Sequence, residues 1–335
     1  MSRPQKFLGY YADWNTAFPP KAIDFGLYTH LNHAFALLDK DGVPTMPDPP
    51  RSRDLCTRAH ARGVKVLLSV GGAESGRGFA RATATPAATG RFADQLVTAA
   101  MSGGYDGVDI DLEAPTNTAE RDGMNALIRA LRGKLPQGDL LTMAVSATDW
   151  GGKWFLNDAL LPYVDWLNVM MYDFHGPWSS HAGHDAPLFP SLADHHAECR
   201  GATVDASSNY WIHTRAWPKD RLLLGIPLYG HGFRVAKWGE PATGNFVRSD
   251  VSFRDLMTLQ KQGWTRTWDD IAKVPTLRNP DGTELISYDD AESIRAKGRY
   301  ARERGFGGVF FWEISQDFNG VTNPLVRAAR AAFLG

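Results

Sequence analysis

The sequence predicts an α/β fold, a (β/α)8 barrel with a small inserted α+β subdomain between its seventh strand and the last helix–strand unit. Eight short apolar runs alternate with helix-like segments along the 335 residues, and this alternation is typical of a barrel. Several runs are almost continuously hydrophobic, as expected for parallel strands that are covered on both faces. No glycine-rich phosphate loop follows the first run, although open doubly wound sheets usually have one.

The apolar runs are rich in Val, Ile, Leu, Tyr and Trp, and they give the expected strands. These strands lie at about residues 6–13, 30–38, 64–71, 107–113, 140–147, 165–172, 222–229 and 307–313. Amphipathic stretches between them predict helices, with clear examples at 54–62, 91–101, 120–135 and 291–304. A single barrel fits this chain length, so we interpret residues 1–335 as one domain.

One interval breaks the alternation. Roughly fifty residues, 234–285, separate the seventh strand from the helix before the eighth, which is too long for an ordinary loop in a compact domain. The interval contains a helix-like piece at 253–261 and a turn signal, Asn279-Pro280-Asp281-Gly282. We therefore expect residues 234–285 to form the inserted subdomain, on the face of the barrel where its chemistry takes place.

Composition and charge exclude several classes of function. The net charge is −1, so no electrostatic feature favours nucleic acid or a membrane surface as a partner. No apolar run is long enough to span a bilayer, and the first residues lack the apolar core of a signal peptide. Two cysteines, Cys56 and Cys199, lack metal-ligand spacing and are expected to be buried free thiols. Eleven Trp residues weakly favour a carbohydrate cleft, because sugar faces stack on aromatic rings.

The most informative segment is Tyr105 to Pro115, which reads Y-D-G-V-D-I-D-L-E-A-P. Asp109, Asp111 and Glu113 alternate along an expected strand, so all three point to one face, with neighbours roughly 6–7 Å apart. Acids that line a barrel interior are costly to bury in ionised form. Burial and like-charge repulsion should raise at least one pKa, so that the group keeps a proton at neutral pH and can serve as a general acid. Glu113 comes last and is expected at the mouth.

Two other interpretations of this acidic row stay open at this point. It could be a solvent-facing acidic edge or a structural aspartate network, and three alternating acids alone do not decide between these and a catalytic row. It could also bind a divalent metal ion, since hard cations favour carboxylates. No His or further acid with matching spacing lies at an obvious strand end, so we predict no metal and no cofactor.

The segment D-G-V-D-I-D-L-E resembles the D-G-x-D-x-D-x-E signature of the family 18 glycoside hydrolases, the chitinases and their relatives. Other similar motifs follow in the family's order over nearly the whole chain. They comprise Gly9-Tyr10-Tyr11, His30 to Phe35, Ser69-Val70-Gly71-Gly72, Met170-Met171-Tyr172-Asp173, Gly225 to Gly230, Trp268 to Pro275, Ile286 to Asp290 and Gly307 to Trp312. The resemblance implies a catalytic (β/α)8 TIM barrel over residues 1–335.

The resemblance also implies roles for the acidic row. Glu113 would protonate the glycosidic oxygen, Asp111 would orient the acetamido group of the substrate, and Asp109 would share a proton with Asp111. Tyr172 would donate a hydrogen bond to the acetamido oxygen. That oxygen would attack the anomeric carbon, giving an oxazolinium ion and net retention, so no second carboxylate nucleophile is needed.

Further residues are implied to bind the sugar. Asp173 would contact it in the cleaved subsite, and Tyr10, Phe35 and Trp312 resemble the aromatic floor and wall of that subsite. Met170, on the sixth strand, is polarizable and could pack against the sugar. The remaining substrate-binding candidates are Gly71, Gly72 and Tyr229. The glycines are also expected to allow close backbone packing beside the row.

The histidines, including His175, His181, His184 and His231, form no metal-like pair on a helix and are interpreted as structural or peripheral. His231 stands where an Arg is common in the family, which alters contacts near the insertion.

The expected activity is that of a chitinase acting on chitin or chitooligosaccharides as a monomer. An extracellular location is expected from the substrate. One alternative is an endo-β-N-acetylglucosaminidase that cuts the core of N-glycans with the same residues. Another is a non-catalytic chitin-binding lectin on the same fold, although such lectins typically lack the acid at the position of Glu113.

Overall fold

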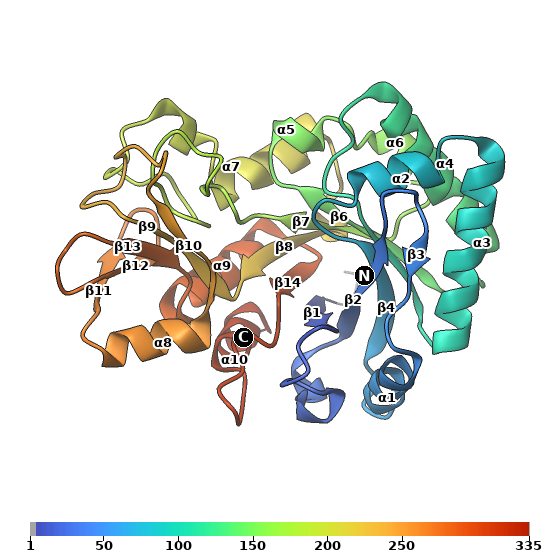
Figure 1. Ribbon diagram of the computed structural model, residues 1–335, viewed down its shortest axis with the longest axis horizontal. Helices are drawn as coiled ribbons and strands as arrows, with labels where there is room; N and C mark the ends of the chain where they lie inside the picture. Colours follow the sequence, from blue (N-terminus) through green and yellow to red (C-terminus); the bar gives the residue numbers. More distant parts are fainter. Residues whose placement is uncertain (1–4, 335) are drawn as a thin grey trace.

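Eight parallel strands close into a barrel in the computed structural model, which describes residues 5–334 (Figure 1). The prediction about a signal peptide falls partly on residues 1–4, which lie outside the described residues. Around the barrel the order is β1-β2-β4-β5-β6-β7-β8-β14, and β14 pairs with β1 to close it. The barrel strands are β1 (Lys6–Ala12), β2 (His30–Leu38), β4 (Lys65–Gly71), β5 (Gly107–Asp111), β6 (Leu140–Ser146), β7 (Trp166–Met170), β8 (Leu222–Pro227) and β14 (Gly308–Trp312).

All eight expected strands are confirmed, and several end one or two residues earlier than predicted. The largest difference that affects the site is at β5, which was expected to reach Glu113 and ends at Asp111. Its pairing stops there because β4 ends at Gly71, the residue in register with Asp111. A short strand, β3 (Pro44–Thr45), pairs antiparallel with the end of β2.

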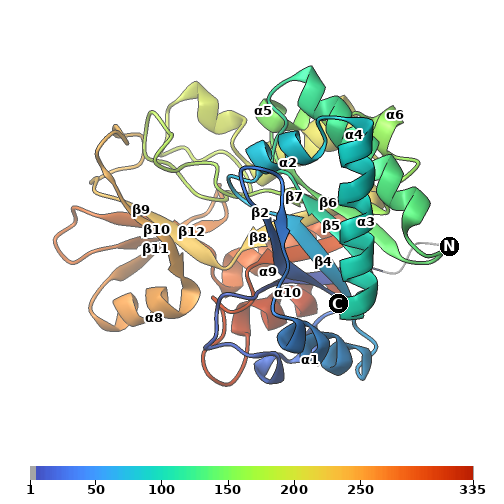
Figure 2. The same ribbon diagram turned by 45° about the vertical axis from the view of Figure 1, so that its right-hand side comes forward.

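Helices surround most of the barrel (Figure 2). They are α1 (Pro49–His60), α2 (Gly76–Ala82), α3 (Pro86–Gly103), α4 (Thr118–Lys134), α5 (Asp149–Gly152), α6 (Asn157–Leu160), α7 (Val204–Asn209), α9 (Ala291–Arg304) and α10 (Pro324–Leu334), with η3 (Ala197–Arg200), η4 (Tyr210–Thr214) and η5 (Lys219–Arg221) as short turns. The prediction of a helix after every strand is wrong between β1 and β2. Two 3₁₀ turns lie there, η1 (Pro20–Ala22) and η2 (Phe25–Leu27).

Local sequence explains where the long helices begin and end. Asp48 accepts the N–H of Arg51 at the start of α1, and Asn117 accepts the N–H of Glu120 at the start of α4. Such caps pair N–H groups that have no partner within the helix. Apolar residues on the inner faces of these helices pack on the outward-facing residues of the strands, among them Val108, Ile110 and Leu112. Because side chains alternate along a strand, the residues between these positions, which include Asp109 and Asp111, face the interior of the barrel.

The insertion is a five-stranded antiparallel sheet, ordered β10-β9-β13-β12-β11, with one helix on it (Figure 1, beside the barrel). Its elements are β9 (Tyr229–Phe233), β10 (Phe246–Ser252), α8 (Phe253–Lys261), β11 (Thr265–Asp269), β12 (Val274–Arg278) and β13 (Leu285–Tyr288). The sheet extends beyond the predicted residues 234–285 at both ends. At its start, the Leu228 N–H donates to the carbonyl of Trp312, and Tyr229, which was expected to end the seventh strand, begins β9 of the insertion instead.

A long connection between β7 and α7, residues 171–203, packs on the insertion. Leu188 N–H donates to the carbonyl of Ala272, and the Asp185 N–H donates to Ser287 Oγ. The connection therefore joins the end of a barrel strand to the inserted sheet. Within residues 5–334, no helix has the length and apolar character needed to cross a membrane.

Candidate active site

Asp109 lies in the barrel interior and is completely buried. Its register partners on the neighbouring strands are Ser69 on β4 and Thr142 on β6, so both hydroxyls reach it. Oδ2 accepts from Tyr10 Oη at 2.9 Å and Ser69 Oγ at 2.8 Å, while Oδ1 accepts from Thr142 Oγ1 at 2.5 Å and Asn168 Nδ2 at 3.1 Å. Four donors aimed at one carboxyl group favour its anion.

Tyr10 was expected to face the sugar, but its ring is 1 % exposed. Its hydroxyl donates to Asp109 and accepts from Asn168 Nδ2 at 3.1 Å. The edge of the ring lies against Trp312, with 5.5 Å between the ring centroids. Tyr10 therefore supports both the acidic row and the aromatic wall from below.

Asp111, one step toward the mouth, is also buried, and its Oδ1 has no hydrogen-bond partner among the described residues. Its carbonyl oxygen accepts the N–H of Gly72 at 2.9 Å. A β-carbon on Gly71, whose φ is +120°, would lie 2.1 Å from that same oxygen. Only glycine fits there. Within this structure Gly71 and Gly72 thus hold the backbone of the row in place.

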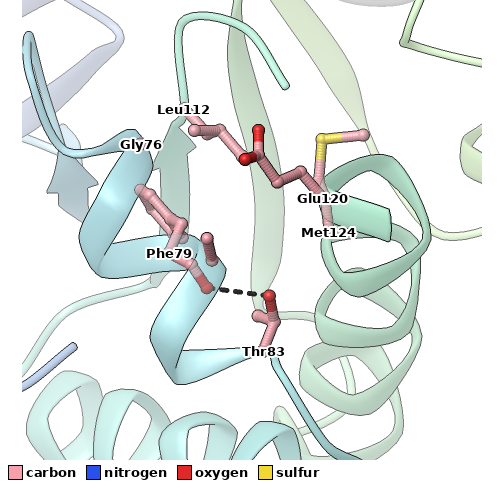
Figure 3. Close-up of a pocket in the computed structure, with 7 residues that line it drawn as sticks. Gly76, Phe79, Thr83, Leu112, Glu120 and Met124 are labelled. Atoms are coloured by element: carbon pink, nitrogen blue, oxygen red, sulfur yellow. Dashed lines mark hydrogen bonds between the residues drawn. The ribbon is translucent and has the colours of Figure 1, made fainter. Parts of the chain in front are cut away.

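Glu113 follows two residues after β5 and is only partly buried. Leu112, between it and Asp111, points the opposite way, into a small pocket between α2 and α4 that is also lined by Phe79 and Met124 (Figure 3). The alternation expected from the sequence therefore continues past the end of the strand. It brings Glu113 to the C-terminal mouth of the barrel.

The electrostatics of the row agree with the expectation of raised pKa values. Burial raises the pKa of Asp109, although hydrogen bonds from Thr142, Ser69 and Tyr10 act against it. Burial and then repulsion from Glu113 and Asp109 raise the pKa of Asp111 well above its ordinary value. Burial, followed by the charge of Asp173, raises the pKa of Glu113. The four hydrogen bonds offset part of this rise at Asp109, whereas Asp111 Oδ1 has no hydrogen-bond partner among the described residues.

Three aromatic rings line the mouth next to this row. Trp312, from the end of β14, stacks on Phe35 with 5.5 Å between centroids and 25° between planes. Phe35 stacks in turn on Trp14, at 5.9 Å and 22°. Trp14 is 58 % exposed, so the stack runs from the interior to the surface. Gly72 makes room for it, because a β-carbon there would lie 2.8 Å from the Phe35 ring.

Tyr172 and Met170 come from the end of β7. Both belong to the interior cluster that contains Tyr10 and Trp312. Tyr172 packs edge-on against Tyr229, with centroids 6.2 Å apart. Burial, and then the negative charge of Asp173 and Asp111, raise the pKa of Tyr172 well above its usual value, so its hydroxyl keeps its proton.

Asp173 follows Tyr172 and adopts a left-handed backbone with φ of 56°. Its Oδ1 accepts from Tyr229 Oη at 2.6 Å and from His231 Nε2 at 2.9 Å. Its N–H donates to Oδ1 of Asp185 at 2.9 Å. Burial lowers the pKa of His231, but Asp185 and Asp173 outweigh it and raise this pKa to about 9. A cation from the insertion therefore faces the acids at the end of β7.

The structure thus brings the predicted residues to one mouth, with Tyr10, Gly71 and Gly72 behind it. Sequence reasoning missed the donors Asn168 and Thr142 and the polar partner Asp185, and it treated His231 as peripheral. Asn168 carried a visible signal, a lone amide inside the apolar strand Trp166–Met170 with the parity of the interior. Asp185 carried none, because it lies in a loop.

Comparison with known proteins agrees with this arrangement. The family model described as "Glycosyl hydrolases family 18" matches residues 6–317. Chitinase A1 of Niallia circulans is 28 % identical, over 94 % of this chain and 57 % of that protein. A class V chitinase of Arabidopsis thaliana is 30 % identical, over 94 % of this chain and 86 % of the relative. The chain spans less than two thirds of the length of several curated relatives that it matches.

Solved structures lead to the same family. The group II chitinase catalytic domain 2 of Ostrinia furnacalis has a TM-score of 0.88 at 27 % identity, covering 99 % of this chain and 97 % of that one. The group IV chitinase of the same organism, solved in complex with allosamidin, has a TM-score of 0.89 at 27 % identity, covering 98 % and 99 %. The family model covers most of the chain, and the barrel carries the acidic row on its interior face. The chain therefore belongs to family 18 of the glycosyl hydrolases.

Proposed function

We propose that this protein is a chitinase that hydrolyses β-1,4-linked N-acetylglucosamine polymers and oligomers with net retention. The observation that carries the proposal is the place of Glu113, at the open end of a row whose inner member, Asp109, accepts four hydrogen bonds. Burial, followed by the charge of Asp173, raises the pKa of Glu113, and a raised carboxyl pKa is the property that a general acid needs.

In the proposed first step, the Glu113 proton passes to the glycosidic oxygen as the bond from that oxygen to the anomeric carbon breaks. The acetamido oxygen of the same sugar donates an electron pair to that carbon, which gives an oxazolinium ion. Asp111 and Tyr172 hold the acetamido group, and this positioning supplies effective molarity. Water then attacks the anomeric carbon from the face that the leaving group has left, while the bond from that carbon to the acetamido oxygen breaks. Glu113 takes up a proton of this water, which restores the acid and completes net retention.

The remaining residues bind and orient the sugar in this proposal. Trp312, with Phe35 and Trp14 stacked beside it, offers an aromatic surface for a sugar face. Met170 packs below the subsite. Asp173 and Tyr229, already bonded to each other, contact the hydroxyl groups. A substrate of this size implies an extracellular location, and we propose that the enzyme works as a monomer.

Hydrolysis of chitohexaose with time-resolved detection of the product anomer tests this proposal. We expect the β-anomer to form first and to mutarotate later, because retention keeps the configuration. Glu113→Gln should lower kcat by about 10²–10⁴-fold while its melting temperature stays the same or rises. A Glu113→Gln variant as active as the parent, or an α-anomer as first product, would contradict it.

Two further measurements separate the alternatives. An endo-β-N-acetylglucosaminidase would act on high-mannose glycoprotein and spare chitobiose and chitotriose conjugates of a fluorophore, whereas a chitinase would release the fluorophore. A lectin would bind chitooligosaccharide without turnover, and then Glu113→Gln would change nothing in the product assay.

A further inference from the structure

A second cluster of ionisable side chains lies away from the acidic row, where the β7–α7 connection meets the insertion. His175, His181 and Asp194 come from this connection, and all three are buried. Their ligand atoms, one from each residue, lie within 4.8 Å of one another. Backbone bonds attach the cluster to the insertion, since Ala182 N–H donates to the Glu240 carbonyl and Gly239 N–H to the Ala182 carbonyl.

The distances within the cluster match those between ligands of one metal ion. His175 Nε2 lies 3.3 Å from His181 Nε2, and His181 Nε2 lies 3.0 Å from Asp194 Oδ2. Nitrogen and oxygen ligands bound tetrahedrally at about 2.0–2.1 Å from Zn2+ are about 3.3 Å apart. Both distances from His181 Nε2 are therefore close to the edge of such a tetrahedron, and the third pair of atoms lies within 4.8 Å.

The polar atoms of His175 and Asp194 that face away from the cluster make hydrogen bonds of the kind that metal ligands usually make. His175 Nδ1 lies 2.8 Å from the His184 carbonyl oxygen, which can only accept, so Nδ1 carries the proton and Nε2 of the neutral ring offers a lone pair. Asp194 Oδ1 accepts the N–H of His196 at 3.0 Å, which leaves Oδ2 for the cluster. Metal-bound histidines usually donate their other N–H to a carbonyl or carboxylate, and this fixes the ring.

Hydrogen bonding alone does not satisfy this cluster. His181 Nε2 faces both His175 Nε2 and Asp194 Oδ2, and a single proton on it serves only one of them. Asp194 Oδ2 is buried and accepts no hydrogen bond of acceptable geometry from the described residues. An unpaired carboxylate oxygen in the interior is costly. A cation between the three atoms would satisfy each of them at once.

We propose that His175, His181 and Asp194 bind a divalent transition-metal ion, with Zn2+ as the best fit to two imidazoles and one carboxylate. The site has a structural role, because it lies in the connection and not at the acidic row. The proposal revises the sequence-based expectation of no metal. The ion fixes the segment that runs from Asp173 to Asp194, and this segment includes Asp185, whose carboxylate bonds to the Asp173 N–H.

Metal binding by the whole chain tests the site without reference to activity. The protein is first stripped with a chelator and dialysed, and Zn2+ is then titrated by calorimetry. We expect one Zn2+ per chain and a rise in melting temperature on binding, since a ligand of the folded state stabilises it. Asp194→Asn and His181→Gln should each weaken binding by more than the 10–100-fold that is typical of losing an outer partner of a ligand. Co2+ should give the strong visible bands of four-coordinate cobalt.

The control is His213→Ala, because His213 is exposed and lies in η4; this variant should bind as the parent does. Asp194→Asn has nearly the same shape as the parent, so it carries the test if His181→Gln fails to fold. The cobalt spectrum needs no variant at all. Absence of stoichiometric binding by the parent, equal binding by Asp194→Asn, or a six-coordinate cobalt spectrum would each overturn the proposal.

Discussion

The acidic row on β5 and the polar group at the end of β7 hold carboxylates in opposite ways. In the row, Asp109 is paired with neutral donors from four other barrel strands, and no cation lies among its bonded partners in the described residues. At the end of β7, Asp173 is paired with His231, a group that carries a positive charge when protonated. The first arrangement keeps protons near Asp111 and Glu113, while the second neutralises a negative charge beside them.

The difference follows from where the partners come from. The register of a closed barrel places Ser69 and Thr142 at the level of Asp109, so the row is fixed by strands. His231 lies on β9 of the insertion, and Asp185 lies in the β7–α7 connection. The second region therefore depends on segments outside the barrel. Loss of the strand-held acceptor Asp109 should lower folding stability, whereas loss of His231 should change the pH dependence of stability.

The largest effect on stability is expected from Asp109→Ala. The substitution leaves the donors of Ser69, Thr142, Asn168 and Tyr10 without their acceptor in a buried site, and each unpaired group costs about 1–3 kcal/mol. We expect the free energy of unfolding to fall by roughly 3 kcal/mol or more, measured as a lower midpoint in urea. A variant that unfolds at the midpoint of the parent would show that the four donors find other partners.

Sequence predicted the first region far better than the second. Hydrophobic runs located all eight barrel strands, and strand parity placed Asp109, Asp111 and Glu113 on one face. Such patterns are local, since they depend only on alternation along one strand. The role of Tyr10 was not local, because its hydroxyl reaches Asp109 across the barrel over 99 positions of sequence.

The second region could not be predicted for a physical reason. Asp185 and the candidate metal ligands lie in a loop, where no fixed period relates spacing to direction. His231 lies on strand β9 of the insertion, and no local pattern predicts how this strand lies against the end of β7. His181 lies six positions after His175 and thirteen before Asp194. A strand would place the first pair on one face but not the second, so neither strand nor helix spacing brings all three to one face. Their meeting depends on the pairing of the connection with the insertion, which only the folded chain shows.

A smaller effect, of opposite sign, is expected from Asp111→Asn. Burial, followed by repulsion from Glu113 and Asp109, raises the pKa of Asp111 in the folded protein. The unfolded chain releases this proton at lower pH, so the free energy of unfolding falls as the pH rises above the pKa of Asp111 in the unfolded chain. An amide removes that cost, and we expect a gain of about 1 kcal/mol at neutral pH, which shrinks toward acid pH. Thermal melts between acid and neutral pH measure it. Hydrolysis of chitohexaose should fall sharply in the same variant, and a loss of stability at neutral pH would contradict the assignment.

The smallest effect is expected from His231→Gln and lies in the pH dependence of stability. The pKa of His231 is held at about 9 by Asp185, Asp173 and Asp250, in spite of its burial. A pKa raised above the unfolded value contributes stability that is complete below about 6.5 and is lost as the pH rises through about 9. His231→Gln should therefore melt at a lower temperature than the parent near pH 6, and the two melting curves should converge above pH 9. His213→Gln, at an exposed position, should follow the parent throughout. The melting temperatures of His231→Gln and the parent could instead change in parallel from pH 6 to above pH 9. His231 would then act in the fold as a neutral ring, and the second region, like the first, would hold its carboxylates without a cation.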